Sequence, residues 1–343
     1  MDTQFLEQFR KGLSQTRHNL SEWLKTTPES KKRINLGLAE ERAVEDRLQV
    51  LDQTLQKTED NSLGICNVCH EEIEKELLEM DYTSCVCLTH LSDEETRRLE
   101  SELELAQTVQ QSLLPHQVPD IPSLEIAAFS RPAQYIGGDY FDFFPFQNGA
   151  QGLLIADVAG HGISASLHMA SLQTLLRSLV PVNDSPEKVV EKMHQLLTHN
   201  IRYTTFVTIF LGAFYPETHM LNYANAGHNP PLLFRSRSNG KPGVDWLKPT
   251  GPALGLVEQP FSSDQNVHLQ LGDILVMYTD GITEAFNDHR QQFGSDRLEG
   301  LVNNAGQLPS KEIVHRILED LQSFTDGRAL EDDATLVVCK IVS

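Results

Sequence analysis

Long apolar runs are missing from this sequence of 343 residues. No apolar run reaches the roughly 18 residues that a membrane-spanning helix needs. The N-terminal residues MDTQFLEQFRKG contain neither an apolar signal segment nor a cleavage site. We therefore expect a cytoplasmic protein that has no membrane partner.

Positive charge is also scarce. Lys and Arg number 28 against 48 Asp and Glu, which gives a formal net charge of −20, and the densest basic cluster is only residues 31–33. Such a chain repels nucleic acids and anionic membranes, so we expect no nucleic-acid partner. The phosphate-binding loop GxxxxGK[ST] is absent from the sequence as well.

Cysteines are few, and four of the five fall between residues 66 and 87. In a reducing compartment, such a cluster indicates a metal site rather than disulfides. A CxxC pair is followed fifteen residues later by a CxC pair, a separation that suits tetrahedral zinc. CxC stands where CxxC is usual, so the fourth ligand stays open, and redox or inert thiols are the alternatives. The candidate ligands are Cys66, Cys69, Cys85 and Cys87, with His90 or His70 able to replace Cys87.

Residues 1–60 have the leucine spacing of two amphipathic helices, which TTPES at 26–30 interrupts. This pattern predicts a helical hairpin. Ser92 and Glu95 then form a capping signature for a further helix that ends before Pro115.

That helix repeats apolar residues at heptad spacing, with Gln110 on the same seam. The repeat favours a homodimer in which Gln110 sets the register, and the alternative is a helix packed on its own domain. Prolines at 115, 119 and 122 mark a boundary. We predict three parts: residues 1–91 as a regulatory hairpin with a zinc module, 92–122 as a coiled-coil-like linker, and 123–343 as a catalytic domain.

From about residue 124 the apolar pattern becomes that of strands. The segments rich in branched and aromatic residues are 124–130, 139–146, 152–158, 204–215, 219–226, 231–236, 273–280 and 334–342. Helical stretches at 163–180, 186–200 and 309–323 lie between them, and residues 210–226 resemble a hairpin. Helices grouped between strands predict an α+β layered domain rather than strict alternation.

Aspartates end or begin these strands at four places: GGDYFD at 137–142, IADVAGHG at 155–162, MYTDGITEA at 277–285 and EDDATLVV at 331–338. One such Asp is an ordinary turn residue. Four clustered carboxylates repel one another unless cations lie between them, and their oxygens suit Mg²⁺ or Mn²⁺. Two such ions can activate water towards a phosphoryl group. His161 is either a general acid or an exposed turn residue.

These motifs, together with NAGHNPP at 225–231, resemble the metal-dependent PPM serine/threonine phosphatases of the SpoIIE/RsbU branch. LAQTVQQSLLP resembles the helix that precedes their catalytic domain. The resemblance implies a layered β-sandwich flanked by helices and single-step hydrolysis without a phosphoenzyme. It implies a phosphoserine or phosphothreonine substrate on an anti-anti-sigma (STAS) protein, and an upstream activator that the residues do not identify.

The resemblance also assigns site residues. The catalytic metal ligands fall on Asp139, Asp157, Asp280 and Asp332, with the carbonyl of Val158 and, second in rank, Asp333. Asp142 is a supporting residue. Gly137 and Gly138 allow close approach to the metals. His228 is expected to be structural, and Arg131 is the nearest candidate for a phosphate-binding arginine.

Residues from about 40 to 91, with GICNVCHEEI at 64–73, resemble the zinc-finger region of DksA/TraR proteins. The resemblance implies a structural zinc ion, and a module of this size needs zinc to fold. The alternative function is a degenerate phosphatase that acts as an adaptor, associated with RNA polymerase or a sigma pathway. The intact Asp positions favour the enzyme.

Overall fold

The structure is a computed structural model. It describes residues 3–26, 41–59, 62–74, 77–78, 83–160, 162–198, 206–236, 243–256 and 264–342. The chain forms two compact units, residues 1–101 and 102–343, and the division falls within one helix. His161 and the connection at 27–40 lie outside the described residues.

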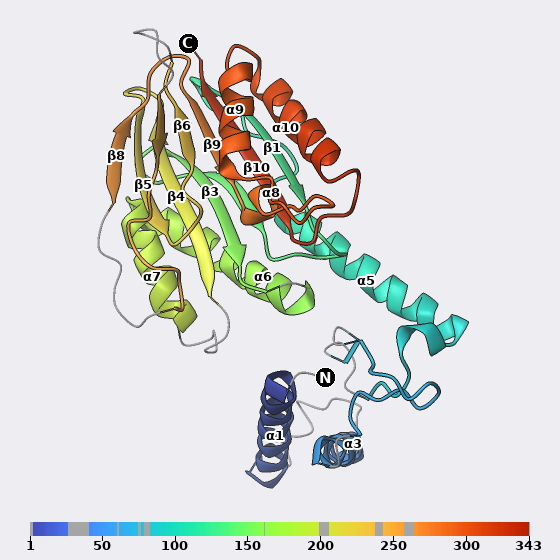
Figure 1. The fold of residues 1–343 in the computed structure, drawn as a ribbon. Helices are drawn as coiled ribbons and strands as arrows, with labels where there is room; N and C mark the ends of the chain where they lie inside the picture. Colours follow the sequence, from blue (N-terminus) through green and yellow to red (C-terminus); the bar gives the residue numbers. More distant parts are fainter. Residues whose placement is uncertain are drawn as a thin grey trace. The chain divides into compact units, whose positions relative to one another are not determined.

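The first unit contains the two expected helices, α1 (Thr3–Thr26) and α3 (Glu41–Glu59), which pack on each other (Figure 1). Arg10 pairs with Glu59 at 3.1 Å and Arg17 with Asp52 at 2.5 Å. A step of seven residues forward along α1 therefore matches a step of seven back along α3, so the two helices are antiparallel.

A further helix, α5 (Asp93–Leu113), begins at the expected capping signature. The Ser92 hydroxyl and amide donate to Glu95 Oε2 at 2.6 and 2.9 Å, and the Glu95 amide donates back to Ser92 Oγ at 3.3 Å. These bonds satisfy amide groups that a helix start leaves without intrahelical partners. The capping prediction is confirmed.

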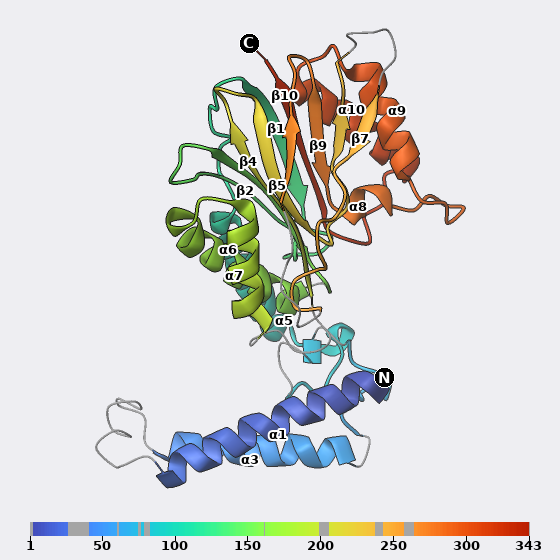
Figure 2. The same cartoon turned by 90° about the vertical axis from the view of Figure 1, so that its left-hand side faces the viewer.

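The second unit contains two antiparallel five-stranded sheets, seen side by side in Figure 2. One sheet has the order β1-β10-β9-β6-β7 and the other β2-β3-β4-β5-β8. The strands are β1 (Leu124–Arg131), β2 (Tyr140–Pro145), β3 (Gln151–Val158), β4 (Val207–Tyr215), β5 (Met220–Ala226), β6 (Leu232–Phe234), β7 (Val244–Trp246), β8 (Gln265–His268), β9 (Ile274–Tyr278) and β10 (Ala334–Ile341).

Helices cover the outer face of each sheet (Figures 1 and 2). They are α6 (Gly162–Leu179), the short η2 (Val180–Val182) and α7 (Pro186–Thr198) on one side, and α9 (Ser295–Ala305) and α10 (Ser310–Phe324) on the other. One buried cluster lies between the sheets and one lies under each helix pair. This is the layered sandwich that the resemblance implies, so the fold prediction is confirmed.

Sequence patterning missed the weakest elements. The strands β7 and β8 are short, polar and at sheet edges, so they show little alternation. The helix α9 contains Gly300 and Asn303, which are weak helix formers, although Leu298 and Val302 are buried at helical spacing. Across the described ranges, no helix is both long and apolar enough to cross a bilayer.

Candidate active site

Antiparallel pairing brings the expected carboxylates together within each sheet. The start of β2 pairs with the end of β3, where Tyr140 faces Ala156, so Asp139 and Asp157 lie at the same end of that sheet. In the other sheet, the end of β9 pairs with the start of β10, where Tyr278 faces Leu336. Asp280, the first residue of the short helix α8 (Asp280–Thr283), therefore lies near Asp332.

A buried threonine joins the two halves of the site. Thr279 Oγ1 donates to Asp139 Oδ2 at 2.8 Å, and it accepts a bond from the Thr335 amide at 2.9 Å. The Thr279 amide donates to the Thr335 carbonyl at 3.0 Å. Thr279 thus holds a carboxylate of one sheet against the strand end of the other. Sequence reasoning missed this residue, and the only signal for it was its place directly before Asp280.

The carboxylates influence one another because they share a partly buried, negatively charged region. Burial, and then the charge of Asp157, raises the pKa of Asp139 well above its ordinary value. Burial also raises the pKa of Asp157 to about 7, and further increases come from the charges of Asp280, Asp332 and Asp333. Like charges held this close are a poor arrangement for a metal-free protein. Their hard oxygen atoms fit divalent Mg²⁺ or Mn²⁺, so the donor set suits the metals that the motifs imply.

The carbonyl of Val158 lies beside the glycine turn, as its assigned role requires. A Cβ added at Gly138 would lie 2.8 Å from the Val158 oxygen and 3.1 Å from the Ala165 side chain. Only glycine leaves this carbonyl room to approach the turn.

Asp333 differs from the other carboxylates because both of its oxygens already accept hydrogen bonds from backbone amides. Oδ2 accepts from the Gly138 amide at 2.6 Å, and Oδ1 accepts from the Ala133 amide at 2.8 Å. A side chain at Gly137 would collide with this carboxylate. Asp333 therefore anchors the 133–138 loop, whereas the neighbouring Asp332 is exposed.

The end of α5 contacts the same turn. Gln110 Nε2 donates to the Gly137 carbonyl at 2.5 Å, and the Gly137 amide donates to Gln110 Oε1 at 3.1 Å. The Gln110 side chain thus forms hydrogen bonds within its own unit, as expected if this helix packs on its own domain. Its register role in a dimer stays a prediction.

Asp142 supports the fold around β2. Its buried carboxylate accepts from the Tyr140 hydroxyl at 2.5 Å and the Phe143 amide at 2.8 Å, and it pairs with Arg177 of α6 at 2.6 Å. Burial raises the pKa of Asp142, and these partners oppose that rise. Asp142 therefore ties α6 to β2.

His228 and Arg131 have different surroundings. His228 is fully buried, shares a hydrogen bond with Thr208 Oγ1 at 2.8 Å, and donates its amide to Asn225 Oδ1 at 2.9 Å. Burial lowers the pKa of His228 to about 3, so the ring stays neutral and structural. Arg131 is exposed and is the last residue of β1. It pairs with Ala334, the residue that follows Asp333.

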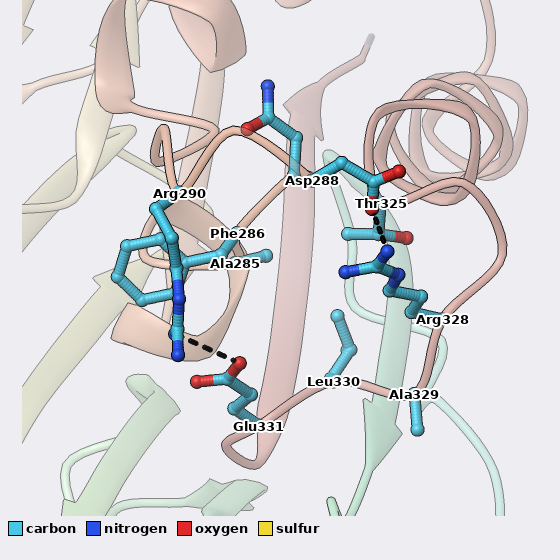
Figure 3. Close-up of a pocket in the computed structure, with 10 residues that line it drawn as sticks. Ala285, Phe286, Asp288, Arg290, Thr325, Arg328, Ala329, Leu330 and Glu331 are labelled. Atoms are coloured by element: carbon cyan, nitrogen blue, oxygen red, sulfur yellow. Dashed lines mark hydrogen bonds and ion pairs between the residues drawn. The ribbon is translucent and has the colours of Figure 1, made fainter.

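A pocket of about 160 Å³ is lined by residues that follow Asp280 and precede Asp332 in the sequence (Figure 3). The loop after α8 and the loop that leads into Asp332 line it. Two ion pairs cross it: Arg290 with Glu331 at 3.4 Å, and Arg328 with Asp288. All four side chains are exposed, so solvent weakens these pairs and a charged ligand can displace them.

The cysteine cluster has a different fourth member from the one expected first. The ligand atoms of Cys66, Cys69, Cys87 and His90 lie within 4.8 Å of one another. Cys85 is exposed and outside this group, because the chain bends at Val86 between the two cysteines. His90 therefore takes the place of Cys85, not that of Cys87.

Comparison with known proteins agrees with the fold and the motifs. The family model described as "Stage II sporulation protein E (SpoIIE)" matches residues 147–342. Phosphoserine phosphatase RsbU of Bacillus subtilis (strain 168) is 30% identical over 244 residues, which cover 71% of each chain. Neither of these two matches describes a zinc finger, so the DksA/TraR resemblance stays a prediction.

Two solved structures share the fold. The SiaA-PP2C domain of Pseudomonas aeruginosa matches with a TM-score of 0.60 and 19% identity, covering 72% of this chain and 98% of that one. RsbX in complex with magnesium matches with a TM-score of 0.50 and 18% identity, covering 66% of this chain and 98% of that one. The solved structures show the fold, and the family match together with the relationship to RsbU shows that this chain belongs to the SpoIIE family.

Proposed function

We propose that this protein hydrolyses phosphoserine or phosphothreonine on a regulatory protein, with two Mn²⁺ or Mg²⁺ ions as cofactors. The observation that carries the proposal is the convergence of carboxylates from both sheets: burial first, and then the charges of Asp280, Asp332 and Asp333, raise the pKa of Asp157 to about 7. An adaptor has no physical need for such a costly group of like charges. The magnesium bound by RsbX supports the choice of metal.

In this proposal, Asp139, Asp157, Asp280 and Asp332 hold the metals, with the Val158 carbonyl as a further ligand. The metals, when bound, lower the pKa of water and neutralise phosphate oxygens. Thr279 keeps the Asp139 carboxylate in one orientation through its 2.8 Å bond. Asp333 holds the loop that carries Gly137 and Gly138 against the site and is the lesser metal-ligand candidate.

The proposed substrate is a phosphorylated STAS-type protein. Support comes from RsbU, which is named a phosphoserine phosphatase, and from the motifs shared with that branch. The exposed Arg290 and Arg328 at the pocket rim supply positive charge for contact with a phosphoprotein (Figure 3). Arg131, at the end of β1, is a further cation near the site.

The test is Mn²⁺-dependent hydrolysis of a small phosphate ester and of a phosphorylated STAS protein. Asp280→Asn keeps the shape of the side chain and removes its charge, so we expect activity to fall by at least about a hundredfold. Asp326→Asn is the matched control, because Asp326 is exposed and in a turn. Unchanged activity in Asp280→Asn would make the two-metal assignment wrong. Inactive wild type, both as the full chain and as residues 102–343, would favour the adaptor alternative.

We also propose that the N-terminal unit regulates the enzyme in response to an upstream activator, and that α5 forms a homodimer. Leu105 and Val109, one helical turn apart on α5, are 65% and 54% exposed. Such residues suit pairing with a second copy. Light scattering at micromolar concentration should detect a dimer, and a single particle of 38.5 kDa would contradict it.

The proposed compartment is the cytoplasm, where thiols stay reduced. All five cysteines are free thiols in the structure. A structural zinc ion bound by the N-terminal unit completes the proposal.

A further inference from the structure

Four side chains in the N-terminal unit converge on one point, far along the sequence from the catalytic carboxylates. Their ligand atoms lie within 4.8 Å of one another, and the residues are Cys66, Cys69, Cys87 and His90. We propose that these four residues bind one zinc ion, which holds residues 62–74 and 83–91 together and fixes the start of α5. This ligand set deepens the structural zinc of the proposed function and rests on it, and it is independent of the phosphatase activity.

The distances among the side chains fit one tetrahedral ion. Zinc bonds of about 2.3 Å to sulfur and 2.0–2.1 Å to nitrogen place two sulfurs about 3.8 Å apart and a sulfur and a nitrogen about 3.6 Å apart. Cys69 Sγ and Cys87 Sγ are 3.7 Å apart. His90 Nδ1 lies 3.9 Å from Cys66 Sγ and 3.1 Å from Cys87 Sγ. The four atoms therefore need only small shifts to bind an ion.

A tight turn presents the first two thiols. Ile65 and Glu72 form a β-bridge, and the Cys66 amide donates to the Glu71 carbonyl at 2.8 Å. The His70 amide closes the turn on the Cys66 carbonyl at 2.9 Å, with His70 in the left-handed region at φ 61°. The Val68 amide points at Cys66 Sγ from 3.4 Å, which favours a charged sulfur. His70 is thus a turn residue and contributes its backbone.

A second turn presents the other two ligands. Residues Leu88–His90 form a single 3₁₀ turn, η1, in which the His90 amide donates to the Cys87 carbonyl at 2.9 Å. The Leu88 amide donates to Glu74 Oε2 at 3.0 Å, and the Asn67 amide donates to the Cys85 carbonyl at 2.8 Å. These bonds join the two segments. They use the backbone of Cys85, while its side chain remains exposed.

The surrounding apolar cluster is too small to fix this arrangement alone. Its buried members are Cys66, Ile73, Leu77, Leu78 and Cys87, with Leu99 of α5 packed partly against them. Two of these residues are the ligands themselves, so most of the cross-linking must come from the metal. His90 precedes the Ser92 cap of α5 by two residues. An ion that holds His90 therefore also positions the first turn of that helix.

The experiment measures zinc in the purified full-length protein and in four variants. Wild type is expected to hold one zinc per chain. Cys85→Ser should keep it, Cys69→Ser and His90→Ala should lose it, and His90→Cys should restore it because a thiolate replaces the imidazole. Cobalt substitution provides a second readout, since the sulfur-to-cobalt absorption band should increase from wild type to His90→Cys.

Thiol labelling tests the same ligand set without relying on variants that could misfold. In the native zinc-loaded chain, a maleimide should label Cys85 alone, because Cys339 is buried and the other three cysteines bind metal. Chelation should expose those three. A wild type without zinc, or zinc lost from Cys85→Ser and kept by His90→Ala, would overturn the proposal. Asp280→Asn should keep its zinc, so failure of this site and failure of the phosphatase assignment are distinguishable.

Discussion

Adding a methyl group at Gly137 should show whether the geometry of the candidate active site depends on the position of Asp333. A Cβ at this position would lie 2.5 Å from Cγ of Asp333 and 2.6 Å from its Oδ1, inside the contact distance of the carboxylate. The carboxylate cannot stay in place, because it is held on its other side by the amides of Ala133 and Gly138. Gly137→Ala therefore forces Asp333 to give up at least one of these bonds.

The size of the effect follows from the bonds that are lost. A hydrogen bond to a charged group contributes about 1.5–3 kcal/mol, and overpacking of a buried site costs about 1–3 kcal/mol. Because the loop can relax in part, we expect the free energy of unfolding of the catalytic unit to fall by about 2–4 kcal/mol. Movement of the Gly138 amide also shifts the adjacent Asp139, so kcat should fall by at least about tenfold, which corresponds to 1.4 kcal/mol in the barrier.

Urea denaturation and Mn²⁺-dependent hydrolysis measure the two effects. Gly300→Ala is the matched control, because a Cβ there meets nothing within 4 Å and the residue lies in α9. That control should keep full activity and gain up to about 1 kcal/mol of stability from helix propensity. If Gly137→Ala behaves like Gly300→Ala, the fixed position of Asp333 is not needed for the site, and the argument from its hydrogen bonds is wrong.

Two further predictions concern pH and substrate binding. Burial lowers the pKa of His228 to about 3, whereas the same side chain in the unfolded protein takes up a proton near pH 6.5. The free energy of unfolding should therefore fall by up to about 1.4 kcal/mol for each unit that the pH is lowered between 6.5 and 3. His228→Asn should remove this component of the slope in urea denaturation at pH 5 and 7, and an identical slope would contradict the assignment. Arg328 lines the pocket in Figure 3, so Arg328→Gln should raise KM for a phosphoprotein roughly threefold to tenfold with little change for a small ester. Arg316→Gln on α10 is the control, and an equal KM change in both variants would place the effect outside the pocket.

The fold of residues 124–342 could be predicted from the sequence because its signals are local. Strands such as β3 and β10 are continuous apolar runs, and each delivers its aspartates at a strand end. Antiparallel pairing then brings those ends together without further information. The same reasoning could not identify Thr279, because its role depends on Thr335 and Asp139, which lie 56 and 140 residues away.

The contacts of some residues could not be predicted from the sequence, because their partners lie far along the chain. Gln110 has heptad spacing that suits a dimer seam, yet its amide bonds both polar groups of Gly137. Asp142 belongs to a metal-site motif, yet its partner is Arg177 on α6. Spacing shows which face a side chain occupies, but it does not show which element covers that face.

The two groups of candidate ligands differ in donor chemistry, which is why we predict two kinds of metal for one chain. Carboxylate oxygens are hard donors that suit Mg²⁺ or Mn²⁺, whereas thiolates and imidazole select zinc. In this protein the donor types are separated: the carboxylates occupy the unit of residues 102–343, and the thiolates and His90 occupy the unit of residues 1–101. Residue type alone therefore led to the prediction of two different classes of metal from the sequence. The choice between Cys85 and His90 required the bend at Val86, which spacing alone does not encode.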